Sequence, residues 1–135
     1  MGNPVIFNEI RIIVAGTRTF SNYELLKSKL DGFISELNQK YPGKQVVIIT
    51  GAAKGADQLG SFYARNHNIP LKEFPADWTT YGKAAGPIRN QQMLDYALRE
   101  IPELIVFWDG ESRGTKNMMN IAKRHNVQTE TVLIQ

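Results

Sequence analysis

The chain has 135 residues, 42% of them hydrophobic, and this length and composition predict one folded domain over residues 1–135. The absence of cysteine excludes a disulfide framework and thiolate metal chemistry. The sequence has neither an apolar run long enough to span a membrane nor a signal-peptide pattern, so we expect a cytoplasmic protein that makes no membrane contact. The formal charge of +3 suits an anionic small ligand and is too small to predict a surface for duplex nucleic acid.

Five runs of apolar, often β-branched residues alternate with stretches in which apolar residues follow helical spacing. After a short arm at residues 1–8, these runs predict strands at 10–15, 46–50, 71–74, 104–108 and 129–134. Strands that alternate with helices form parallel βαβ units with right-handed crossovers. We therefore predict an α/β fold, a single Rossmann-like three-layer domain with a five-stranded parallel sheet in the order 3-2-1-4-5. Its switch point lies between the first and fourth strands, where such sheets bind ligands.

The helical stretches are expected at about 21–41, 55–67, 87–101 and 115–124. Ser21 and Glu24 have the spacing of a capping box, in which the Ser21 hydroxyl caps the first helix. Pro87 fits the first turn of the third helix, because its missing N–H has no helical partner there. The residues from 75 to about 86 are predicted to form the longest irregular connection of the chain.

Three glycine-centred loops follow predicted strands, at residues 15–19, 50–57 and 108–115. Glycine lets the backbone approach an anion closely, and a helix that begins there adds partial positive charge. Three such loops at one edge of a sheet predict a single phosphate-bearing ligand. The candidate ligand-binding residues in these loops are Gly16, Thr17, Arg18, Gly51, Ala52, Lys54, Gly55, Asp57, Asp109, Ser112, Gly114 and Thr115.

Several of these candidates also have an ordinary structural interpretation. Arg18 is either a phosphate ligand or a solvated side chain, and Asp57 either caps the second helix or accepts ribose hydroxyls, with capping the favoured role. Either Ser112 or Thr115 is expected to be a plain helix cap. The loops match neither the Walker motif nor the strict dinucleotide fingerprint, so NAD-dependent dehydrogenase chemistry is not indicated.

The stretch from 75 to 90 combines aromatic residues with charged ones. Long irregular loops in compact domains are usually functional or disordered, and the aromatic residues argue against disorder. The candidate ligand residues here are Asp77, Lys83, Arg89 and Asn90. Trp78 or Tyr81 could stack on a base; the alternative is a structural cover whose aromatic side chains fill the core.

Taken together, the segments 14–18, 51–57, 75–78, 82–90 and 108–115 closely resemble the YspA-like, YpsA-related branch of the SLOG superfamily. The resemblance spans nearly the whole chain, and 82–90 is its most specific part. The superfamily also holds the Lonely Guy phosphoribohydrolases and the DNA-processing protein DprA. The resemblance implies a Rossmann-like fold with a glycine-rich nucleotide site, and a nucleotide or a nucleotide-derived ligand such as an ADP-ribose-type molecule.

One departure from the related enzymes concerns catalysis. The Lonely Guy enzymes carry a catalytic glutamate three positions after the threonine of a glycine-threonine pair, and here that position is Met118, which we expect to be helix core. Asp109-Gly110 also replaces the proline-glycine start of their motif. Methionine neither takes up a proton nor stabilises a developing cation, so hydrolysis by that mechanism is not expected. The resemblance makes Arg89 the counterpart of a substrate-positioning arginine, and Asp77 or Asp109 could supply the acid group.

Our leading hypothesis is a nucleotide-derivative binding domain that acts as a sensor, a sequestering protein or an accessory subunit. Phosphate is expected at residues 51–55 and 114–115. The alternative is an enzyme that cleaves an N-glycosidic or phosphoester bond, and it gains if Asp77 or Asp109 has a raised pKa inside the pocket. A third reading, single-stranded nucleic-acid binding, is disfavoured by the modest charge. His67 and His125 lack metal-ligand spacing, so no metal site is expected; a cofactor and a homo-oligomer are left open.

Overall fold

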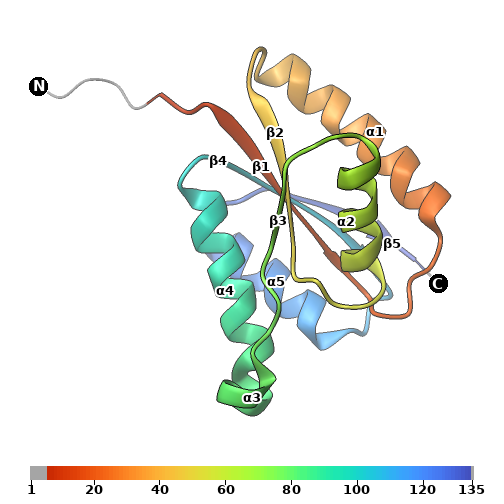
Figure 1. Cartoon of the computed structure of the whole chain (residues 1–135), viewed down its shortest axis with the longest axis vertical. Helices are drawn as coiled ribbons and strands as arrows, with labels where there is room; N and C mark the ends of the chain where they lie inside the picture. The colour runs from red at the N-terminus through yellow and green to blue at the C-terminus, as the bar shows by residue number, and fades with distance from the viewer. Residues whose placement is uncertain (1–5, 135) are drawn as a thin grey trace, which may run out of the picture.

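The computed structural model describes residues 6–134, and its strands form one parallel sheet covered on both faces by helices (Figure 1). The strands are β1 (Glu9–Gly16), β2 (Gln45–Thr50), β3 (Leu71–Glu73), β4 (Ile101–Trp108) and β5 (Thr129–Leu133). They lie in the order β3-β2-β1-β4-β5, and each neighbouring pair is parallel. The predicted α/β class, Rossmann-like topology and strand order are confirmed. Residues 1–5 of the predicted arm lie outside the described residues.

The helices are α1 (Tyr23–Lys40), α2 (Ala56–Asn66), α3 (Trp78–Tyr81), α4 (Ala85–Leu98) and α5 (Arg113–Arg124), with a 3-10 turn at Gly82–Ala84. Figure 1 shows α1 and α2 on one face of the sheet and α4 and α5 on the other. Within residues 6–134, none of these helices combines the length and the hydropathy needed to cross a bilayer.

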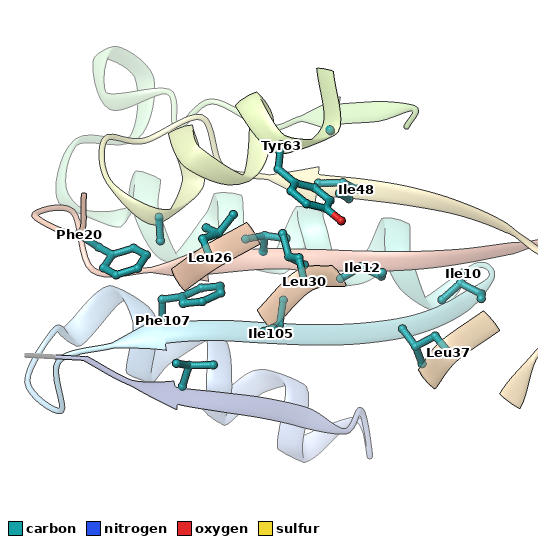
Figure 2. Packing of buried hydrophobic residues seen from close by; sticks show 14 residues of the cluster. Ile10, Ile12, Phe20, Leu26, Leu30, Leu37, Ile48, Tyr63, Ile105 and Phe107 are labelled. Atoms are coloured by element: carbon teal, nitrogen blue, oxygen red, sulfur yellow. The ribbon is translucent and has the colours of Figure 1, made fainter. Parts of the chain in front are cut away.

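Burial on both faces of β1 explains why its residues 12–15 form a continuous apolar run. Ile10 and Ile12 pack into the cluster that α1 and α2 cover, whereas Ile13 and Ala15 pack into the cluster under α4 and α5. At the carboxyl end of the sheet, the ring of Phe20 stacks on that of Phe107 with centroids 5.3 Å apart (Figure 2). This packing fixes the backbone where the first and third glycine loops leave the sheet.

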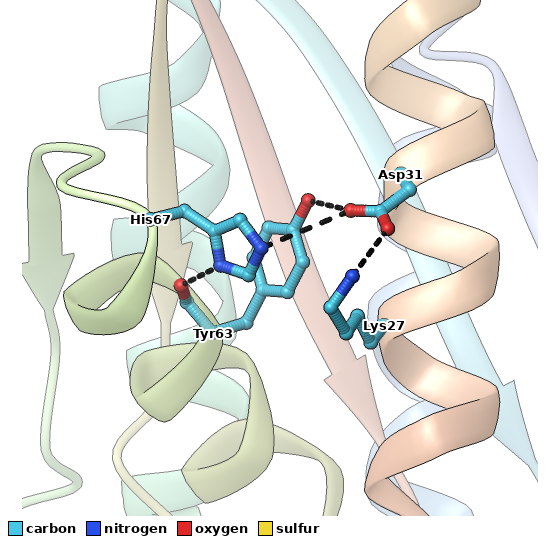
Figure 3. Close-up of polar contacts among 4 residues, drawn as sticks. All are labelled: Lys27, Asp31, Tyr63 and His67. Carbon is cyan, nitrogen blue, oxygen red and sulfur yellow. Dashed lines mark hydrogen bonds and ion pairs between the residues drawn. The ribbon is translucent and has the colours of Figure 1, made fainter.

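A polar cluster joins α1 to α2 (Figure 3). Asp31 accepts hydrogen bonds from the Tyr63 hydroxyl at 2.6 Å and from Lys27 Nζ at 2.8 Å, and the ring of His67 stacks on Tyr63. These hydrogen bonds, first that from Lys27, lower the pKa of Asp31 below its usual value. The cluster holds α2 against α1, and α2 carries Asp57 in its first turn.

The predicted cap of α1 was one residue too early. Asn22, not Ser21, is the N-cap residue, and its Oδ1 accepts a hydrogen bond from Leu25 N at 3.0 Å. Asn and Ser are equally good caps, so the local sequence offered two starts. Beginning at Tyr23 leaves Leu26 and Leu30 fully buried on the inner face of the helix.

The connection expected to be irregular from residue 75 to about 86 is largely helical. Asp77 caps α3 by accepting a hydrogen bond from Thr80 N at 3.0 Å, and α4 begins at Ala85, which places Pro87 in its first turn as predicted. At the other end, Ile101 was expected on the third helix and instead begins β4, because Pro102 disfavours the helical conformation in the residue before it.

Candidate functional site

A cavity of about 310 Å³ opens at the carboxyl ends of β1 and β4, at the predicted switch point. Its volume lies at the lower end of the range of small-molecule sites. The walls come from the end of β1, one face of α4, and the first turns of α2 and α5. The sequence-predicted candidates that line it are Gly16, Arg18, Asp57, Arg89, Asn90, Ser112, Gly114 and Thr115.

Arg89 is held in place although it is only 8% exposed. Its Nη1 donates to the carbonyl oxygen of Gly51 at 2.5 Å, and its Nε donates to Asn90 Oδ1 at 3.1 Å. The amide of Asn90 in turn donates to Asn117 Oδ1 at 2.9 Å and to the Gly114 carbonyl at 3.2 Å. This network joins α4 to the loop after β2 and to the first turns of α5, so the guanidinium faces the cavity in a fixed position.

Asp57 is the buried carboxylate of this cavity. It lies in the first turn of α2, is 6% exposed, and accepts a hydrogen bond from Ala53 N at 3.4 Å. Burial raises the pKa of Asp57 to about 6, against the opposing effect of the Arg89 guanidinium. The cavity therefore holds a carboxyl group that changes its charge near neutral pH.

The carboxylate of Asp57 and the guanidinium of Arg89 both border the space beside Gly51. A Cβ atom at Gly51 would collide with the Arg89 guanidinium and would lie 2.7 Å from Asp57 Oδ2. Gly51 itself does not line the cavity. Its contribution is the space that it leaves for these two charged side chains.

Thr17 connects all three glycine loops through its own backbone and hydroxyl. Its N–H donates to the Phe107 carbonyl at 2.9 Å, its carbonyl accepts from Ala56 N at 3.2 Å, and its hydroxyl accepts from Asp109 N at 3.1 Å. Gly55, with φ +79°, is required at this junction because a Cβ there would collide with the Thr17 carbonyl. Thr17 is buried, and these contacts assign it to holding the loops together.

The mouth of the cavity carries an aromatic side chain and a cation. Trp78 of α3 lines the cavity and remains 50% exposed, and the Arg18 guanidinium lies 5.6 Å from the centroid of its ring. Tyr81, the other aromatic candidate, is exposed but does not line the cavity. The structure thus favours Trp78 over Tyr81 as a surface on which a base could stack.

The third glycine loop leads into α5, and the first residues of this helix line the cavity. Asp109 Oδ1 accepts hydrogen bonds from Glu111 N at 2.9 Å and Ser112 N at 2.8 Å, and these bonds lower the pKa of Asp109. Ser112 is the N-cap residue of α5, yet its side chain makes no capping hydrogen bond to the helix backbone. A Cβ at Gly114 would meet nothing within 4 Å, so this turn leaves open space beside its backbone.

The remaining candidates do not line the cavity: Thr17, Gly51, Ala52, Lys54, Gly55, Asp77, Lys83 and Asp109. Lys54 and Lys83 are exposed, and Asp77 is occupied as the cap of α3, whose hydrogen bonds lower its pKa. Neither Asp77 nor Asp109 is therefore the raised-pKa carboxyl group that the hydrolase alternative required. The cavity-lining carboxyl group with a raised pKa is Asp57.

Several lining residues escaped the sequence reasoning: Ala53, Gly86, Pro87, Met93, Arg113 and Asn117. Asn117 was detectable, because it lies one helical turn after Arg113 and three residues after Gly114 on the same side of α5. Met118 is buried in the core as expected, and it also lines the cavity. The position that the Lonely Guy resemblance assigns to a glutamate thus faces this cavity as a methionine.

Comparison with known proteins places the chain in a family. Residues 10–81 match the model of the YspA, cpYpsA-related SLOG family, which takes in the first two glycine loops and ends before α4. The chain is also 26% identical over 122 residues to Gene 61 protein of Mycobacterium phage D29, a match that covers 87% of this chain and 91% of that protein. No solved structure gives a significant match. Because the family model covers more than half of the 135 residues, the protein belongs to the YspA, cpYpsA-related SLOG family.

Proposed function

We propose that the protein binds a nucleotide or nucleotide-derived ligand of the ADP-ribose type, and that it acts as a sensor, a sequestering protein or an accessory subunit. Membership of the SLOG family is compatible with nucleotide-related binding or processing. The observation that carries the proposal is the composition of one cavity: Arg18 and Arg89, the start of α5 and the exposed Trp78 all face it.

The phosphate is assigned to the first turn of α5. The first N–H groups of a helix have no partner within it, and together with the positive end of the helix dipole they attract an anion. The open space beside Gly114 lets a phosphate approach the backbone. Arg89 supplies a fixed positive charge to the same cavity through its network with Asn90. A charged donor in a fixed orientation binds phosphate more strongly than a solvated side chain.

The base is assigned to the mouth. An exposed tryptophan ring offers a flat apolar face, and stacking of a base on such a ring is tolerant of base identity. Arg18 already lies near that face, so a bound base displaces it or lies beside it. This arrangement supports a ligand with an aromatic ring at one end and phosphate at the other.

Removing Arg89 is expected to weaken the ligand complex. Arg89→Ala deletes a charge-assisted contact and should cost on the order of 1.5–3 kcal/mol in binding free energy. The measurement is isothermal titration calorimetry with a panel of adenine nucleotides, ADP-ribose and cyclic nucleotides. Because Arg89→Ala also loses the hydrogen bond to the Gly51 carbonyl, circular dichroism is used to verify that the variant keeps its fold.

Lys123→Ala is the control for that experiment. Lys123 lies near the carboxyl end of α5, is exposed and does not line the cavity, so its loss removes one positive charge without touching the site. Affinity should change little. The proposal is wrong if no ligand of the panel binds the parent protein below millimolar concentration, or if Lys123→Ala weakens binding as much as Arg89→Ala does.

A second candidate function, hydrolysis of a nucleotide, has one observation in its favour. Asp57 is a cavity-lining carboxyl group with a pKa raised to about 6 by burial, which is the property of a group that takes or gives a proton near neutral pH. The loss of a carboxylate at Met118 argues against the phosphoribohydrolase mechanism. Binding without rapid turnover therefore remains the leading proposal.

Incubation of the protein with AMP or cytokinin-type nucleotides should release little ribose 5-phosphate. The reason is that Met118 faces the cavity where the related enzymes have a glutamate, and methionine cannot stabilise a developing positive charge on the sugar. Released sugar phosphate is measured by chromatography over hours. A turnover comparable to that of a dedicated phosphoribohydrolase would instead place Asp57 in the role of the acid group and make hydrolysis the function.

A further inference from the structure

We propose that Asp57 binds the sugar hydroxyls of the ligand, so that the cavity selects a ribose-bearing phosphate over one whose sugar lacks those hydroxyls. The inference rests on the proposed function and deepens it, because it names the part of the ligand that discriminates. It also reverses the preference for plain helix capping that the sequence alone gave for Asp57.

The geometry leaves the Asp57 carboxylate with spare acceptor capacity. A carboxylate has about four lone-pair positions for hydrogen bonds. Among the described residues it receives the long hydrogen bond from Ala53 N at 3.4 Å, and the N–H of Gly51 is also close enough to lower its pKa. A side chain that only capped α2 would be expected to make shorter bonds to the helix backbone. Asp57 instead lines the cavity, where a ligand can supply the missing donors.

The nearby cations do not use up that capacity. Arg89 of α4 and Arg18 of the loop after β1 are the charged groups close enough to influence the pKa of Asp57. Neither forms an ion pair with it, since the pairs within 4.0 Å among residues 6–134 involve other side chains. The hydrogen bond of Arg89 Nη1 goes instead to the Gly51 carbonyl.

The charge and hydrogen-bonding groups of the ligand determine which part of it can bind to the Asp57 carboxylate. An ionised carboxylate repels phosphate, which therefore belongs with Arg89 and the start of α5. Hydroxyl groups donate hydrogen bonds without bringing negative charge, and two adjacent hydroxyls can serve both oxygens of one carboxylate. The 2′- and 3′-hydroxyls of ribose have that arrangement. A hydrogen bond to a buried charged group contributes more than one to a neutral group.

A pair of ligands that differ only in these hydroxyls tests the inference. AMP and 2′,3′-dideoxy-AMP carry the same base and phosphate, so the ratio of their dissociation constants isolates the sugar contacts. By calorimetry at pH 7.5, the parent protein should bind AMP at least about 10-fold more tightly, as one or more hydrogen bonds to a charged acceptor predict. In Asp57→Ala the ratio should fall close to one, while the affinity for the dideoxy ligand does not fall.

Protonation of Asp57 gives a second readout in the unmutated protein. A neutral carboxyl group accepts hydroxyls less well, so the preference for AMP should shrink as the pH falls from 8 to 5. The phosphate also titrates near pH 6, but it does so in both ligands and cancels in the ratio. Asp57→Asn, which keeps the shape of the side chain, should show no such pH dependence of the ratio.

The outcomes separate this inference from the proposed function. Equal affinity of the parent for the two ligands, or a ratio independent of pH, overturns the role of Asp57 and leaves nucleotide binding in place. Failure of both ligands and of every nucleotide in the panel to bind overturns the proposed function and this inference with it. If Asp57→Ala does not fold, the ratio in the parent protein and its pH dependence still decide.

Discussion

Replacing Gly51 by valine is expected to abolish ligand binding while the protein stays folded. The first atom of the new side chain would occupy the space of the Arg89 guanidinium and lie 2.7 Å from Asp57 Oδ2. The end of a long arginine can move, so the collision is relieved by expelling Arg89 from its bond to the Gly51 carbonyl. The cavity then loses its fixed cation. Calorimetry should find the affinity lowered by more than about 100-fold, which corresponds to roughly 3 kcal/mol.

Gly32→Val is the matched control. Gly32 lies in the middle of α1, and a Cβ there meets nothing within 4 Å, so the same substitution adds the same atoms in open space. Its nucleotide affinity should equal that of the parent. A Gly51→Val protein that is folded by circular dichroism and binds ligand as tightly as Gly32→Val would show that the ligand does not use this cavity.

The fold was predictable because its signals repeat along the chain. The central strands are buried on both faces, so β2 and β4 contain the continuous apolar runs 46–49 and 104–108, which helical periodicity does not produce. The order of strands then follows from the rules for parallel crossovers, with little freedom in a chain of this length. The errors lie at the ends of helices. The sequence offers both Ser21 and Asn22 as the cap of α1, and it does not show whether α4 ends at Leu98 or continues to Ile101.

The site was less predictable, because its geometry depends on contacts between distant residues. Arg89 bonds to Gly51, and Asn90 bonds to Asn117 on a different helix. Nothing near Arg89 in the sequence indicates that its guanidinium approaches the loop after β2. Arg18 and Gly114 were expected at the site because they lie in loops that follow strands, and both line the cavity. Position after a strand could not tell which side chains of each loop face inward.

The three aspartates show how local hydrogen bonding misleads such reasoning. Asp77 and Asp109 both follow strands, yet each turns back to accept a hydrogen bond from an N–H three residues later. Asp57 occupies a similar place at the start of a helix, but the burial of α2 and the side chain of Arg89 enclose it. Which carboxylate is local and which belongs to the cavity is decided by tertiary packing.

Asp57→Asn is expected to stabilise the protein at alkaline pH and to do so much less in acid. Burial raises the pKa of Asp57 from its usual 3.8 to about 6 in the folded protein. A raised carboxyl pKa means that its favourable contribution is complete below about pH 4 and is lost as the pH rises through 6, because ionisation then favours the unfolded chain. A shift of this size is on the order of 3 kcal/mol at pH 8 and a small fraction of that at pH 4. Asparagine does not ionise, so the variant does not lose stability as the pH rises.

Urea denaturation at pH 8 and pH 4 measures these free energies of unfolding, and Asp77→Asn provides the control. Asp77 is exposed and its pKa is lowered by its capping hydrogen bonds, so removing its charge gives no gain at pH 8. If Asp57→Asn is no more stable than the parent at pH 8, or gains equally at both pH values, then Asp57 is not a destabilised buried carboxylate. A gain confined to high pH, together with loss of the preference for ribose, means that the chain keeps a costly charge in its core because the ligand requires it.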